Sequence, residues 1–169
     1  MLTRVLVSVP LVAGLLAIAA TPAQAHAIIE LNGTAAIAGQ VSEMTLEVQH
    51  GCITKGTGTV QVLAYVGKPW GRVSPEPVTG WTATTKRLES GGQQVVWTTT
   101  GEPQPFSTPL YLPMRIRWPK AQGVYGMTVT QVCTDDITTW STPFGPATAD
   151  APSPPLTPLA QVKVLAKVG

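Results

Sequence analysis

Short runs in which apolar and polar side chains alternate recur along this chain, and no stretch shows a convincing apolar period of 3.6 residues. In the clearest run, Met114, Ile116 and Trp118 alternate with Arg115 and Arg117. Because successive side chains of a β-strand point to opposite faces, this pattern predicts a strand with one buried and one solvated face. Similar runs cover residues 44–52, 60–66, 93–100 and 127–133.

Turn-forming residues separate these runs. Asn32-Gly33, Gly91-Gly92 and the Pro-containing stretch 103–109 are examples. Several short strands with turns between them predict an all-β chain, folded as an antiparallel β-sandwich.

The first 25 residues have the pattern of a secretory signal peptide. Residues 1–4 include a basic side chain, residues 5–20 are almost wholly apolar, and Ala23-Gln24-Ala25 fits the small-x-small cleavage rule. A 16-residue apolar run is short for a membrane span, which needs about 20 residues. We therefore expect an exported, periplasmic or secreted protein of 144 residues, 169 minus 25, without a membrane anchor.

The composition changes towards the C-terminus. Residues 146–158 are rich in Pro, Ala, Ser and Thr, which is typical of a linker that buries no core. We accordingly expect a signal peptide at 1–25, a β-sandwich domain at 26–145, and a Pro-rich linker and tail at 146–169. The final segment, 161–169, fits either a short strand or a frayed end.

The charge is nearly balanced once the signal peptide is excluded. Leaving out Arg4 reduces the eleven basic residues to ten, against nine acidic residues. This balance gives no reason to expect nucleic acid or an anionic membrane as a partner.

The chain contains only two cysteines, Cys52 and Cys133. In an exported protein they are expected to form one disulfide, although two thiolates on a soft metal ion are an alternative. A disulfide would bring the two Cα atoms within about 7 Å. His50 and the segment from Cys133 to Trp140 would then lie at the same end of the sandwich.

The chain also contains only two histidines, and one of them, His26, directly follows the predicted cleavage site. A free N-terminal histidine can chelate a metal ion through its α-amine and its imidazole nitrogen. Nitrogen donors in a tetragonal arrangement suit Cu(II), and His50 would add a third. The alternatives are a solvated terminal His26 and a structural His50. Cleavage after Ala27, which the small-x-small rule also allows, would delete His26 from the mature protein.

Catalytic patterns are weak by comparison. The chain has no Gly-x-Ser-x-Gly turn and no Gly-rich phosphate loop. The adjacent carboxylates Asp135 and Asp136 fit a polar turn. We therefore do not expect an enzyme.

Four segments together resemble the YcnI-like family of exported copper-binding proteins. They are His26 after Ala23-Gln24-Ala25, Val48 to Cys52 (V-Q-H-G-C), Pro77 to Trp81 (P-V-T-G-W), and Gln131-Val132-Cys133 followed by Trp140. The resemblance implies an immunoglobulin-like β-sandwich that holds Cu(II) at a new N-terminal histidine.

The same resemblance assigns roles to individual residues. It implies that His26 is the chelating terminus and that Trp140 is an aromatic residue near the metal. His50 falls where one branch of the family has an acidic ligand, and Glu47 is a weaker candidate because its strand parity points away from His50.

The implied function is copper capture, trafficking or homeostasis, with a membrane copper transporter or a cuproprotein as a partner. Two alternatives stay open. One is a histidine-brace copper monooxygenase acting on polysaccharide. The other is a metal-free β-sandwich used for binding or adhesion.

Overall fold

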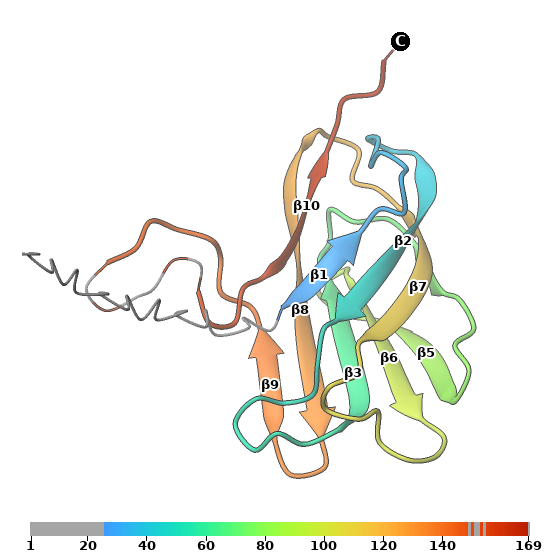
Figure 1. The fold of residues 1–169 in the computed structure, drawn as a ribbon. Coiled ribbons are helices and arrows are strands. Elements are labelled where there is room, and N and C mark those ends of the chain that lie inside the picture. Colours follow the sequence, from blue (N-terminus) through green and yellow to red (C-terminus); the bar gives the residue numbers. More distant parts are fainter. Residues whose placement is uncertain (1–25, 149, 151–152, 154, 169) are drawn as a thin grey trace, which may run out of the picture.

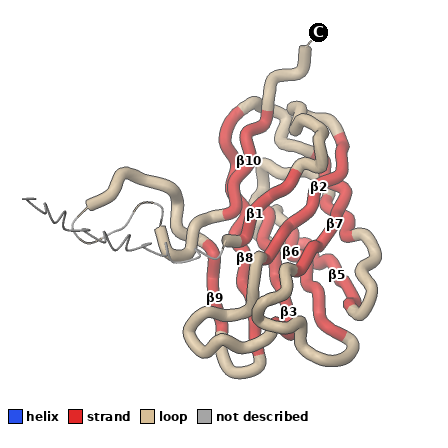
Figure 2. The backbone as a smooth tube through the Cα atoms, viewed as in Figure 1, coloured by secondary structure: helices blue, strands red, loops and turns tan. Residues whose placement is uncertain are grey.

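The computed structural model describes residues 26–148, 150, 153 and 155–168. The predicted signal peptide, 1–25, lies outside the described residues. The described part of the chain forms ten β-strands and no helix, and the strands make two sheets that face each other across one core (Figure 2). All pairs between neighbouring strands in these sheets are antiparallel. The predicted all-β, antiparallel sandwich is therefore confirmed.

The first sheet has four strands, which are named here in the order in which they pair. They are β1 (Ala27–Glu30), β2 (Val41–Val48), β7 (Leu110–Arg117) and β4 (Val73–Pro75). Figure 1 shows β1, β2 and β7 side by side.

The second sheet has six strands, and β8 pairs with three of them. Its members are β10 (Ala160–Val164), β8 (Gly123–Cys133), β3 (Thr59–Val66), β6 (Gln93–Thr99), β5 (Trp81–Arg87) and β9 (Ile137–Trp140). One edge of β8 pairs with β3, and the other is shared end to end by β10 and β9.

The alternation that predicted β7 appears directly in its burial. Leu112, Met114 and Ile116 are completely buried, whereas Arg115 and Arg117 are exposed. Full burial of each such apolar side chain stabilises the fold by about 1.5–3 kcal/mol. The core between the sheets therefore consists of the inward-facing residues of each strand.

The sandwich includes residues that the sequence analysis placed in the C-terminal tail. Strand β10 pairs with β8, from Ala160 opposite Met127 to Val164 opposite Gly123. Ala160, Val162 and Val164 are buried. The segment is thus a strand, and the folded domain extends beyond residue 145. Five residues were too few for their alternation to separate a strand from a frayed end.

No helix among the described residues is long and apolar enough to cross a membrane.

Candidate metal site at the start of β1

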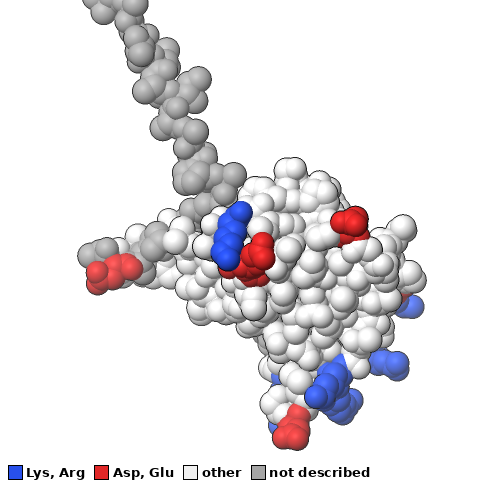
Figure 3. All heavy atoms as spheres, turned by 90° about the horizontal axis from the view of Figure 1, so that it is seen from below, with Lys and Arg blue, Asp and Glu red and all other residues white. Residues whose placement is uncertain are grey.

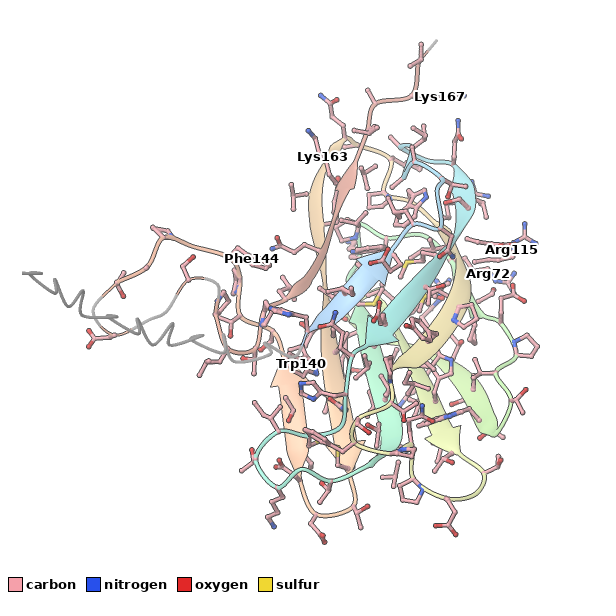
Figure 4. The ribbon with its side chains drawn as sticks, viewed as in Figure 1. Arg72, Arg115, Trp140, Phe144, Lys163 and Lys167 are labelled. Atoms are coloured by element: carbon pink, nitrogen blue, oxygen red, sulfur yellow. A yellow bond between two sulfur atoms is a disulfide. The ribbon has the colours of Figure 1, made fainter. Side chains whose placement is uncertain are left out.

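His26 is half-buried and directly precedes β1. Its carbonyl oxygen accepts a hydrogen bond from the backbone N–H of Gln49, at 3.3 Å. It lines a cleft of about 180 Å³ together with Phe144 and residues 158–161. Figure 4 shows Phe144 close to where β1 begins, on the same side of the molecule as Trp140. His26 is therefore held at one end of the sandwich, next to the end of β2.

His50 lies in the bend after β2. The predicted strand run 44–52 was too long at this end, because β2 stops at Val48. The Nδ1 atom of His50 lies 2.6 Å from the carbonyl oxygen of Gly51, and its ring centroid is 5.1 Å from that of Phe106. A carbonyl oxygen only accepts, so Nδ1–H is the donor and Nε2 carries the free lone pair. This is the usual arrangement of a histidine that binds a metal.

The turn that carries His50 requires glycine at position 51. The Gly51 N–H donates to the Phe106 carbonyl oxygen at 2.8 Å, and the Cys52 N–H donates to the Thr57 carbonyl oxygen at 3.1 Å. A Cβ atom at residue 51 would collide with the carbonyl oxygen of Thr57. The backbone of this turn therefore packs too closely for any other residue.

The two cysteines form the disulfide that the sequence predicted. The Cα atoms of Cys52 and Cys133 are 6.0 Å apart, and the bond spans 81 residues of sequence. Because both sulfur atoms are used, the alternative of two thiolates on a metal ion is wrong. The disulfide ties the His50 turn, which follows the first sheet, to the end of β8 in the second sheet.

Trp140 is completely buried at the end of β9. Its indole N–H donates to Oε1 of Gln131 at 3.3 Å. The Gln131 amide in turn donates to the His50 carbonyl oxygen and to Oγ1 of Thr59, both at 2.7 Å. A chain of hydrogen bonds thus connects Trp140 to the His50 turn through one buried amide.

The connecting role of Gln131 was not predicted from the sequence. The sequence does contain an indication of this role: Gln131 places a polar amide on the apolar side of the run 127–133, between Val129 and Cys133. A polar side chain at a core position needs internal partners, and here those partners are the residues around the candidate site.

Glu47 lies opposite Ile28 in the β1–β2 register, and alternation along β1 assigns His26 to the same face as Ile28. Burial raises the pKa of the Glu47 carboxyl above its usual value, and the nearby charge of Glu30 raises it further. Strand alternation therefore places Glu47 on the face of His26, but it does not extend to His50, which lies in the bend after β2.

Within the described residues, no three side chains of His, Cys, Asp or Glu lie close enough together to hold a metal ion. The donors available here are the two imidazoles and, once the bond before His26 is cut, its α-amine. That amine and the His26 imidazole suit a chelate of Cu(II), which the His50 Nε2 atom could extend.

Solved structures identify the class of fold. A crystal structure of an uncharacterized protein from Nocardia farcinica, with an immunoglobulin-like fold, matches with a TM-score of 0.65 at 20% identity, covering 82% of this chain and 97% of that one. A cohesin module from the family 33 glycoside hydrolase of Clostridium perfringens ATCC13124 matches with a TM-score of 0.53 at 13% identity, covering 84% and 96%. This chain therefore has an immunoglobulin-like fold, as the resemblance implied. At these identities, the likeness speaks for the fold alone.

The family follows from sequence. The chain belongs to the DUF1775 family, described as a domain of unknown function, which matches residues 26–158. This match begins at His26, and membership is consistent with the YcnI-like resemblance. No curated protein matches the chain.

Proposed function

We propose that this protein is an exported copper-binding protein of the YcnI-like type, which acts in copper capture, trafficking or homeostasis. In this proposal, signal-peptide cleavage before His26 frees an α-amine, and that amine and the His26 imidazole chelate Cu(II). Nε2 of His50 supplies a third nitrogen. Copper is the cargo of the protein, and a membrane copper transporter or a cuproprotein is the expected partner.

The pairing of β1 with the end of β2 carries the proposal. The hydrogen bond from Gln49 to the His26 carbonyl oxygen aligns those two residues, so that His50 is the next residue along. The backbones of the chain's two histidines thus lie near each other where β1 pairs with the end of β2, although 24 positions separate the two residues in the sequence. The orientation of His50, with Nδ1 against a backbone carbonyl, leaves Nε2 for a metal ion.

Trp140 and Glu47 have supporting roles in this proposal. Trp140 acts through Gln131, which fixes the carbonyl oxygen of His50. Glu47, on the face shared with His26, or a water molecule would complete the coordination. A site with few protein ligands leaves room for ligand exchange, which suits a carrier better than a storage protein.

The intact mass of the exported protein, with and without one equivalent of Cu(II), tests processing and binding together. We expect a chain that starts at His26, lacks two hydrogen atoms because of the disulfide, and gains one copper ion. A chain that starts at Ile28, or one that takes up no copper, would refute the proposal.

A variant with one Ala inserted before His26 separates the chelate from the imidazole alone. The insertion keeps both histidines but moves the α-amine away, so Cu(II) affinity should fall almost as far as in His26→Ala. Insertion of Ala between Glu89 and Ser90, in the exposed turn between β5 and β6, is the matched control and should leave affinity unchanged. Equal affinity of the N-terminally extended and native proteins would exclude the amine as a ligand.

A further inference from the structure

Three arginines lie together on the outer face of the first sheet, away from the candidate copper site. In the register of β4 with β7, Val73 is opposite Ile116 and Ser74 is opposite Arg115. Arg72, one residue before Val73, therefore lies beside Arg117. Arg115 and Arg117 point outward on β7, since Ile116 between them is buried. Figure 4 shows Arg72 and Arg115 on the side of the molecule opposite Phe144.

The structure holds Arg117 in place. Nη1 of Arg117 donates to the Gly39 carbonyl oxygen at 3.1 Å. Its aliphatic stem crosses the backbone of Gly71 so closely that a Cβ atom there would be 2.6 Å from Cβ of Arg117. The guanidinium is thus positioned before any ligand arrives, which lowers the entropy that binding would lose.

The backbone beside Arg72 is equally well fixed. The Gly71 N–H donates to the Arg117 carbonyl oxygen, and the Arg117 N–H donates to the Arg72 carbonyl oxygen, both at 2.9 Å. From the opposite sheet, Nε2 of Gln93 donates to the Gly71 carbonyl oxygen at 2.8 Å. The segment that carries Arg72 is therefore anchored on two sides.

This arrangement puts like charges side by side. Neighbouring like charges on adjacent strands destabilise a sheet. Glu43 is opposite Arg115 in the β2–β7 register, and Glu76 lies on the rim of the cavity. The three guanidinium groups nevertheless leave an excess of positive charge.

The arginines surround a cavity of about 330 Å³, whose other lining residues are Val41, Ser74 and Glu76. Arg117 also lines a second cavity, of about 420 Å³, together with Lys68, Lys120 and the aromatic residues Trp70 and Tyr125. Five of the eleven basic residues thus line these two cavities, although the face that Figure 3 shows has few charges. Positive charge is therefore gathered locally, although the whole chain is nearly neutral.

We propose that the cavity between Arg72, Arg115 and Arg117 binds a phosphate group. Guanidinium groups match the oxygen atoms of phosphate in pairs, and a tetrahedral anion can accept hydrogen bonds from several guanidiniums at once. The Ser74 hydroxyl provides a further donor. The cavity exceeds the volume of one phosphate, so the group can belong to a larger molecule such as a phospholipid, or it can be free.

Two probes distinguish these sources. Inorganic phosphate is titrated by calorimetry against chloride at matched ionic strength, and phosphatidylcholine vesicles with and without phosphatidylglycerol are tested by co-sedimentation. Arg72→Gln and Arg115→Gln should each weaken binding about tenfold or more, because each removes a charged hydrogen-bond donor. Lys163→Gln and Lys167→Gln, at exposed positions of β10 and the segment after it, are the matched controls.

If the native protein binds inorganic phosphate and the arginine variants do not, the result would support a soluble ligand. If the native protein binds only the anionic vesicles, the result would support a lipid headgroup. Binding of neither probe, or equal losses in the arginine and lysine variants, would overturn the proposal. Melting temperatures check folding, and Arg72→Gln should raise the melting temperature without phosphate, because repulsion is relieved. Cu(II) affinity, measured in parallel, should not change, so this test is independent of the copper proposal.

Discussion

Gly51 shows how one residue can control the orientation of His50. Replacing Gly51 with Ala would push Cβ into the Thr57 carbonyl oxygen and displace the turn from Phe106. We expect Gly51→Ala to destabilise the protein by about 2–4 kcal/mol, as other strained or overpacked substitutions do. Urea denaturation measures this loss.

Gly33→Ala is a useful comparison for Gly51→Ala. Gly33 has a φ of 78°, and a Cβ atom there would meet no other atom within 4 Å. Its loss of stability would therefore come from backbone conformation alone, and we expect it to be about 1 kcal/mol. A Gly51→Ala protein as stable as the wild type would contradict the close packing of this turn.

The buried side chain of Gln131 takes part in three hydrogen bonds. Gln131→Leu would leave the Trp140 indole N–H, the His50 carbonyl oxygen and the Thr59 hydroxyl without this partner. We expect a loss of about 2–4 kcal/mol in the free energy of unfolding. Gln61→Leu, which removes one partly buried hydrogen bond to Thr98, should cost about 1 kcal/mol or less. Similar losses in the two variants would argue against the buried network.

Glu47 gives a pH-dependent prediction. Its pKa is raised in the folded protein, so its ionisation disfavours the fold. This destabilisation is absent below the unfolded pKa of about 4.3, grows as pH rises, and is complete above the folded pKa. Glu47→Gln should therefore raise the melting temperature at pH 7 but not at pH 3, as thermal scans at both pH values can show. Glu89→Gln, on an exposed turn, should show no such rise.

At the scale of the strand, substitutions in β10 can measure how much this last strand contributes to the stability of the fold. Val162 is buried on the inner face of β10, whereas its neighbour Lys163 is exposed. Val162→Asp buries an unpaired carboxylate and should cost about 3 kcal/mol or more. Lys163→Asp should change stability by about 0.5 kcal/mol or less, so chemical denaturation of this pair decides whether β10 is part of the core.

The strands differ in how clearly the sequence predicts them. The alternating runs correspond to β2, β3, β6, β7 and β8, each at least seven residues long. Strands β1, β4 and β9 have only three or four residues, too few to show a period. Strand β5 lies at a sheet edge and is exposed on both faces after Trp81, so it has no buried side to produce a pattern.

The candidate site was predictable only in part. The two cysteines identified the disulfide, because two cysteines allow only one pairing. The position of Trp140 in the core and its link through Gln131 depend on how β9 pairs with β8, which no local pattern encodes. The position of Gln49 opposite His26 likewise follows from the register of β1, and a four-residue strand is too short for its register to be predicted from the sequence.

For the molecule as a whole, the disulfide joins one sheet to the other. Closing a loop of 81 residues should stabilise the protein by about 4–5 kcal/mol in the chain-entropy model. The double variant Cys52→Ala, Cys133→Ala should lose about this amount in urea denaturation. Its Cu(II) affinity should also fall, since the His50 turn would lose its link to β8. Unchanged stability would mean that sheet packing alone fixes the two halves.

The position of β10 in the second sheet also affects when, during synthesis, that sheet can finish folding. Among the described residues, 123–126 of β8 pair with β10 alone, and Met127 pairs with both β3 and β10, so this part of β8 needs residues 160–164, which a ribosome adds later. Until then, that half of the β8 edge has open backbone N–H and C=O groups, which are prone to pair with other chains. The second sheet is therefore complete only once residues 160–164 have been made, and a chain that still lacks them is expected to aggregate more readily.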